Sequence, residues 1–120
     1  MASTAQLIET AVRRFQAEIP ALAKLKLVFG LELRGRGDVQ LYRVELPGPK
    51  ISKAVADDAR VTVTMPRSHF NELATEGRAQ DYRRAFEAGQ IKVEGDSNVQ
   101  KLIAQVVARH EQRARLKKVH

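Results

Sequence analysis

The sequence lacks cysteine and tryptophan, and only six of its 120 residues are phenylalanine or tyrosine. Without cysteine there is no disulfide framework, no thiolate nucleophile and no cysteine-based zinc site, which fits a reducing, cytoplasmic compartment. No apolar run approaches the roughly 20 residues that a membrane-spanning helix needs. The amino terminus shows no basic patch followed by an apolar block, so a secretory signal is not expected either. These absences predict a soluble, cytoplasmic protein.

Side chains that carry out catalysis or hold metals are also sparse. Among the histidines, only His69 has a carboxylate at helical spacing, Glu72 three residues later, and His110 and His120 add no further ligands. We therefore interpret all three histidines as surface residues. None of the serines stands in a nucleophile elbow, and no glycine-rich loop is followed by a phosphate-binding lysine. We expect no enzymatic activity, no metal site and no cofactor.

The charge of the chain is strongly unbalanced, with 21 basic residues against 14 acidic ones and a formal net charge of +7. Residues 109–120 supply four of these charges, with five lysines and arginines against one acid, Glu111. This basic C-terminal tail offers transient contact with an anionic membrane, although a solvated helix end is the simpler interpretation. Nucleic acid is not an expected partner, because the few aromatic residues fall mostly on predicted core or cavity faces.

Both ends of the chain have the periodicity of amphipathic helices. Near the amino terminus, Ser3 and Gln6 have the spacing of a capping box, and an apolar stripe follows until Pro20 stops the helix. The last helix is predicted from about residue 97 to the mid-110s, with Asp96 as its cap. Its apolar stripe is the cleanest helical pattern in the chain: Val99, Leu102, Ile103, Val106, Val107.

The middle of the chain alternates between apolar and polar residues, which is typical of half-buried strands. Strands are predicted at residues 25–33, 39–46, 59–65 and 90–94, with a weaker candidate at 51–55. Pro66 opens one short helix, and Asp81 caps a second that Gly89 ends. We expect an α+β fold in one domain, residues 1–120, with an N-terminal helix in residues 1–20 and helices on one face of the sheet.

Two segments resemble the sterol carrier protein family, the SCP2-like sterol- and lipid-binding domains. The first runs from Ala56 to Phe70, an Asp-Asp-Ala turn followed by an alternating Val-Thr strand, a methionine and a helix with phenylalanine. The second, Ala85 to Asp96, joins an Ala-Phe pair, a glycine, an alternating strand and Gly-Asp before the final helix. The similarity is strong over residues 57–103, whereas Pro66 and Arg67 and the basic tail depart from the family's pattern.

The resemblance implies a five-stranded, largely antiparallel sheet covered by helices, with a hydrophobic tunnel between the two layers. It also implies non-enzymatic binding or transfer of a lipid, sterol, fatty acid or acyl-CoA. The residues that would face the ligand are Phe70, Leu73, Phe86, Ile91, Val93, Leu102, Ile103 and Val106.

Two alternatives remain open. Each of these apolar residues taken alone is more typical of an ordinary packed core. The domain could also serve as an interaction or dimerisation module that partners a lipid-metabolising enzyme, or form a homodimer itself.

Overall fold

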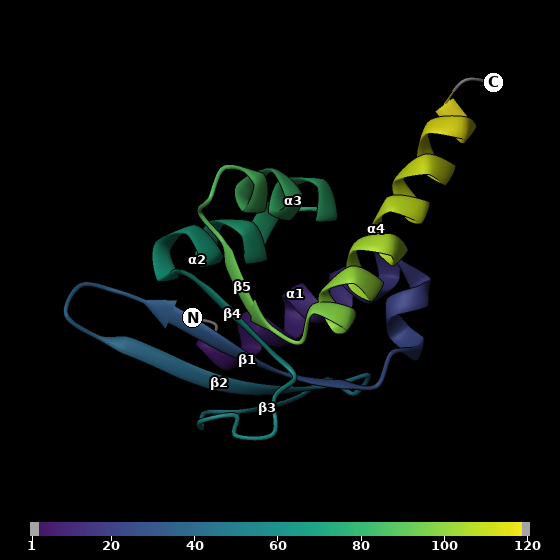
Figure 1. Cartoon of the computed structure of the whole chain (residues 1–120). Helices are drawn as coiled ribbons and strands as arrows, with labels where there is room; N and C mark the ends of the chain where they lie inside the picture. The colour runs from purple at the N-terminus through teal and green to yellow at the C-terminus, as the bar shows by residue number, and fades with distance from the viewer. Residues whose placement is uncertain (1–2, 119–120) are drawn as a thin grey trace.

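The computed structural model describes residues 3–118, and side chains as far as residue 113. Helices stand at both ends of the chain and a five-stranded sheet lies between them (Figure 1). In chain order the elements are α1 (Thr4–Glu18), the 3-10 helix η1 (Pro20–Lys24), β1 (Leu27–Arg34), β2 (Val39–Leu46), β3 (Lys50–Ser52), β4 (Val61–Pro66), α2 (Arg67–Glu76), α3 (Ala79–Glu87), β5 (Lys92–Gly95) and α4 (Ser97–Lys118).

The sheet has the strand order β3-β2-β1-β4-β5. Its pairings are antiparallel except for β1 with β4, which run parallel. The predicted α+β class and the largely antiparallel five-stranded sheet are therefore confirmed. The parallel pair arises because the chain leaves β3 at one edge and returns beside β1, at the centre of the sheet.

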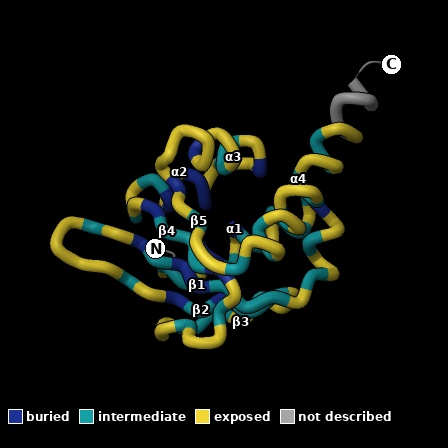
Figure 2. Tube along the Cα trace, viewed as in Figure 1, coloured by how far each residue is buried: buried dark blue, intermediate teal, exposed yellow. Residues whose placement is uncertain are grey.

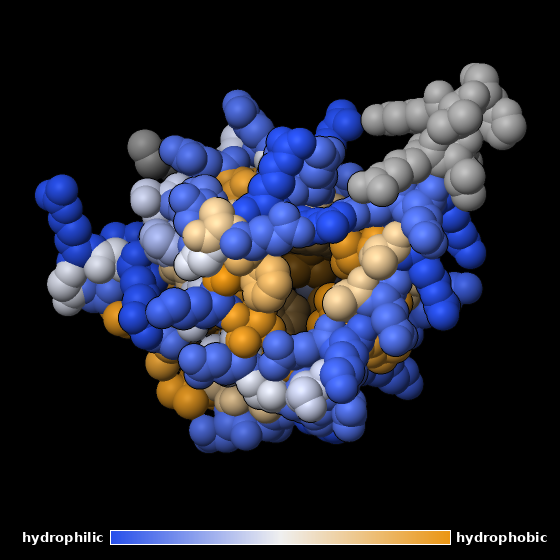
Figure 3. Space-filling view, turned by 45° about the horizontal axis from the view of Figure 1, so that its top comes forward, coloured by the Kyte–Doolittle hydropathy of each residue, from blue (hydrophilic) through white to orange (hydrophobic). Residues whose placement is uncertain are grey.

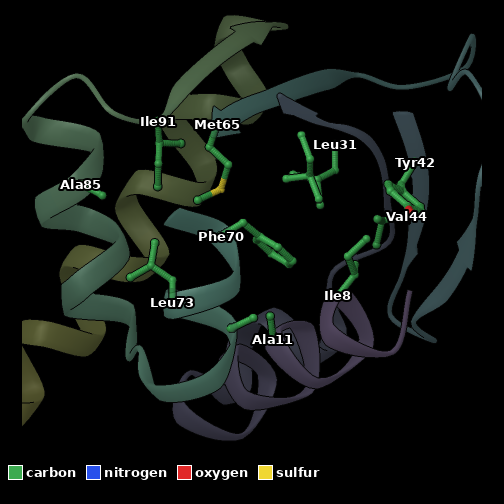
Figure 4. Close-up of a cluster of buried hydrophobic side chains, with 12 residues drawn as sticks. Ile8, Ala11, Leu31, Tyr42, Val44, Met65, Phe70, Leu73, Ala85 and Ile91 are labelled. Carbon is green, nitrogen blue, oxygen red and sulfur yellow. The ribbon is translucent and has the colours of Figure 1, made fainter. Parts of the chain in front are cut away.

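One face of the sheet carries the core. In β1 the buried side chains are Leu31 and Leu33, whereas Glu32 and Arg34 point to the opposite face, as the alternating pattern predicts. Helices α1, α2 and α3 cover the apolar face, and Figure 4 shows Phe70 of α2 pointing into the middle of the cluster. The core cluster consists of Ile8, Ala11, Leu31, Leu33, Tyr42, Val44, Met65, Phe70, Leu73, Ala74, Ala85 and Ile91.

The N-terminal cap forms as the sequence predicts. The Ser3 hydroxyl accepts from the Gln6 backbone N–H at 3.2 Å, and the Gln6 side chain accepts from the Ser3 N–H at 2.8 Å. Helix α3 begins earlier than expected, at Ala79, so the prediction that Asp81 is its cap is wrong. Asp81 occupies the third helical position instead, where its carboxylate accepts from the Arg78 N–H at 2.8 Å.

A tight turn between β5 and α4 sets the direction of the last helix. Gly95 has φ +126°, and a Cβ there would collide with the backbone of Arg60 and Val61, so only glycine fits. Asp96 then caps α4, because its carboxylate accepts from the Asn98 N–H at 2.9 Å and from the Arg60 guanidinium at 2.7 Å. Both roles were predicted and are confirmed.

Helix α4 projects away from the sheet and gives the molecule an elongated outline, with extents of 49 × 27 × 26 Å (Figure 1). In Figure 2 the buried segments concentrate in the sheet and in the helices that cover it, whereas α4 is exposed or half-buried along its described length. None of its described side chains belongs to the core cluster. Within the described part of the chain, no helix has the length and apolar character needed to span a bilayer.

Candidate apolar ligand site

The eight residues expected to face a ligand fall into two groups. Phe70, Leu73 and Ile91 are buried members of the core cluster, and Val93 is half-buried against it (Figure 4). These four side chains come from α2, from β5 and from the residue just before β5. They form the packed interior under the helices, so their side chains contact one another more than open space.

The other four residues lie on α3 and α4 and are much less covered. Phe86 is 49% exposed and Leu102 is 45% exposed, which is unusual for such large apolar side chains. Ile103 and Val106 are half-buried. Sequence periodicity had placed all four on the inner side of their helices, but it could not show that the inner side of α4 stops short of the core.

The stripe along α4 is the central feature of this region. Val99, Ile103, Val106 and Val107 recur at helical spacing, and each is half-buried, while the residues between them are exposed except for Gln100. This half-burial means that the stripe faces the rest of the molecule. Yet none of these side chains belongs to the core cluster or packs against it. The stripe is therefore partly covered without being part of the packed core.

Figure 3 shows a hollow with hydrophobic walls, on the side of the molecule where α3 and α4 come forward. On α3, Phe86 stands one turn from Arg83, whose guanidinium reaches Glu111 of α4, so Phe86 lies on the side of α3 that faces α4. We call this hollow the apolar cleft. The large apolar side chains of the two helices beside it are Phe86 on α3 and Val99, Ile103, Val106 and Val107 on α4.

A polar bridge spans α3 and α4. Arg83 forms an ion pair with Glu111 of α4 and a second one with Glu87 of its own helix, at 3.0 Å. A depression of about 320 Å³ adjoins the bridge. It is lined by Arg83, Gln105, Ala108, Arg109, Glu111 and Gln112. From the sequence, Glu111 was expected only as the single acid of the basic tail, and Arg83 carried no prediction. Val107 was predicted as part of the apolar stripe but was not among the residues expected to face a ligand.

Two further groups lie near the helices without forming a reactive site. Tyr82 of α3 packs on Phe15 of α1 with ring centroids 4.6 Å apart, and burial raises the pKa of its phenol to about 12. His69 is half-buried, and its Nε2 lacks a hydrogen-bond partner among the described residues. His110 is half-buried as well, so the interpretation of these two as exposed surface histidines is wrong. His120 lies outside the described residues. In the described part of the chain, no group of three or more histidines and carboxylates is arranged to hold a metal ion.

The outer face of the sheet carries a second depression, of about 410 Å³. Glu32, Arg34, Lys92 and Glu94 contribute charges of both signs to it, and threonines of β4 lie between them. Such a mixed, solvated surface has no preference for an apolar ligand. The candidate site is therefore the apolar cleft on the opposite face.

The sequence matches the model of the SCP-2 sterol transfer family over residues 8–108. The chain belongs to this family. The matched range extends from the first turns of α1 into α4 and includes both segments on which the sequence resemblance rests. No curated protein matches the sequence significantly.

Solved structures of sterol carrier proteins share the fold. Sterol carrier protein 2-like 2 from Aedes aegypti is 24% identical, with a TM-score of 0.58, and the match covers 83% of this chain and 95% of that one. Sterol carrier protein 2 from Aedes aegypti, solved in complex with palmitate, is 19% identical with a TM-score of 0.57, over 90% and 97% of the two chains. A sec-alkylsulfatase from Pseudomonas sp. matches at 13% identity and a TM-score of 0.57, covering 88% of this chain but only 16% of the sulfatase.

Proposed function

We propose that this SCP-2 family protein binds and carries an apolar molecule, a lipid, sterol or fatty acyl compound, in the apolar cleft between α3 and α4, without chemical conversion. One observation carries the proposal: the apolar stripe of α4 faces the body of the protein but lies outside its packed core. Solvent contact with such a stripe is unfavourable, and a ligand that covers it removes apolar surface from water on both partners.

The physical driving force is burial of hydrocarbon. Each Å² of apolar surface removed from water contributes about 25 cal/mol before the costs of ordering the ligand are deducted. A ligand between the stripe and the core would have α4 as one wall and the helices and sheet as the others. This arrangement would produce the enclosed tunnel that the family resemblance implies. A ligand held there by hydrocarbon burial would need few polar contacts with the protein.

The palmitate complex of the Aedes aegypti protein supports an apolar ligand, since that protein has the same fold. The composition of the cleft supports a carrier in preference to an enzyme. Its defining side chains, Phe86 on α3 and the aliphatic stripe on α4, offer neither a nucleophile nor a proton donor.

The proposal is tested by titrating the purified protein with a fluorescent fatty acid such as cis-parinaric acid. Binding should be saturable, and Ile103→Glu should weaken it at least tenfold because a charge in the cleft must be desolvated when the ligand enters. Ala104→Glu is the matched control, since Ala104 is the next residue of the same helix and is exposed. If the wild type binds neither fatty acids nor sterols, or if both variants behave alike, the cleft is not the ligand site.

An interaction or dimerisation module is the second candidate. It is favoured by the sulfatase match, in which a domain of this fold makes up a small part of an enzyme chain. A second copy or a partner enzyme would then cover Phe86 and Leu102. Light scattering after size-exclusion chromatography separates the two functions, because a module of this kind is associated without lipid and a carrier is not. The same samples, passed over anionic vesicles, test whether residues 109–120 contribute membrane contact.

A further inference from the structure

Glu111 continues the apolar stripe of α4. It stands four residues after Val107 and eight after Ile103, so the three side chains share one face of the helix. A carboxylate therefore occupies the end of an otherwise aliphatic stripe. Its side chain is only 21% exposed, although the neighbouring residues Gln112 and Arg113 are exposed.

The two carboxylate oxygens of Glu111 have different surroundings. Oε2 pairs with the Arg83 guanidinium across the two helices. Oε1 is buried and has no hydrogen-bond partner among the residues that the structure describes. A buried acceptor without a donor is costly, and most such atoms in folded proteins are paired. Oε1 is thus an unused acceptor beside the apolar cleft.

The charges of the Arg83–Glu111 ion pair limit which lipid head groups can bind beside it. Arg83 already contacts two carboxylates, those of Glu87 and Glu111. An anionic head group would have to compete with both for the guanidinium, and it offers Oε1 no proton. A neutral hydroxyl supplies the missing donor and keeps the Arg83–Glu111 pair intact.

We propose that Glu111 is a polar subsite that binds the hydroxyl group of a neutral, long-chain lipid whose hydrocarbon lies in the apolar cleft. This inference rests on the proposed function, since it assigns a head-group specificity to the same cleft. The depression of about 320 Å³ next to Glu111 provides room for a small head group. In its lining, Gln105 and Gln112 add neutral polar contacts, and Arg109 adds a positive charge.

The test compares three ligands of similar length by displacement of cis-parinaric acid from the full chain: dodecan-1-ol, 1-methoxydodecane and laurate. The alcohol should bind roughly tenfold more tightly than its methyl ether, which lacks the donor, and more tightly than laurate. Equal affinities for the alcohol and the ether, or tighter binding of laurate, would overturn the subsite and leave the proposed function standing. If none of the three ligands binds, the proposed function itself fails.

Two variants test whether the preference for the alcohol over the ether arises at Glu111. Glu111→Leu should bring the alcohol-to-ether affinity ratio close to one, because it removes the acceptor and keeps the cleft apolar. Glu87→Leu should leave the ratio unchanged, since it removes the same charge from Arg83 without altering Oε1. Circular dichroism checks that both variants are folded. A ratio that survives in Glu111→Leu, or that disappears equally in Glu87→Leu, contradicts the assignment.

Discussion

At the scale of single residues, Asp96 shows how one carboxylate fixes a junction between elements. The Arg60 guanidinium and the backbone N–H groups of Asn98 and Val99 hold the pKa of Asp96 below its usual value of 3.8. Its ionised form is therefore favoured in the folded state. The resulting stabilisation is complete above the unfolded-state pKa and is lost as the pH falls through the lower folded-state pKa.

Asp96→Asn should flatten this pH dependence, because asparagine keeps the capping geometry but does not ionise. We expect the wild type to have a higher Tm than the variant at pH 7, and the difference to shrink as the pH falls below about 4. Thermal unfolding followed by circular dichroism from pH 7 to pH 2 measures it. Asp57→Asn is the control, since Asp57 is exposed and makes none of these contacts. A difference that stays constant over this range would contradict the account.

At the scale of elements, α4 differs from α2 in what its apolar side chains contribute. Leu73 of α2 belongs to the core cluster, whereas Ile103 of α4 does not. Leu73→Ala should lower the free energy of unfolding by about 2–4 kcal/mol, because it leaves a cavity among packed neighbours. Ile103→Ala should lower it by less than about 1 kcal/mol, because Ile103 is half-buried and does not pack against the core cluster. Urea unfolding measures both values. Equal losses would mean that α4 is part of the core and that the cleft is filled.

The elements themselves were largely predictable from the sequence, because each depends on local periodicity and caps. The stripe and capping box of α1, the hairpin of β1 and β2, and the Gly95-Asp96 turn all follow from neighbouring residues. The predicted helix boundaries were wrong where one residue type is favourable at two different positions of a helix. Aspartate stabilises a helix both as its cap and in its first turn, so Asp81 gave a start three residues too late. The short helix η1 has no periodic signal and was missed.

The site was less predictable, because periodicity shows which side of a helix is apolar but not what that side meets. Phe70 and Ile103 looked equivalent in the sequence, yet one is buried in the core and the other faces the cleft. Glu111 was overlooked because its charge suggested a solvated tail. Its spacing of four residues from Val107 could have indicated that Glu111 lies on the same helix face as the apolar stripe.

At the scale of the whole molecule, the sheet and α1 to α3 form a packed unit, and α4 projects from it (Figure 1). The packed unit holds the fold together, whereas the apolar side chains of α4 remain available to a ligand. It accounts for large exposed side chains such as Phe86 and Leu102 in a chain whose core is otherwise well buried.

The most direct test is nuclear magnetic resonance of methyl-labelled protein with dodecan-1-ol, read through intermolecular nuclear Overhauser effects. The account predicts contacts from the alkyl chain to the methyl groups of Ile103 and Val107, which line the cleft. It predicts none to Leu33 and Val44, which are fully buried in the core. Saturable binding with contacts confined to other surfaces, such as Val39 and Leu41 on the outer face of the sheet, would contradict it.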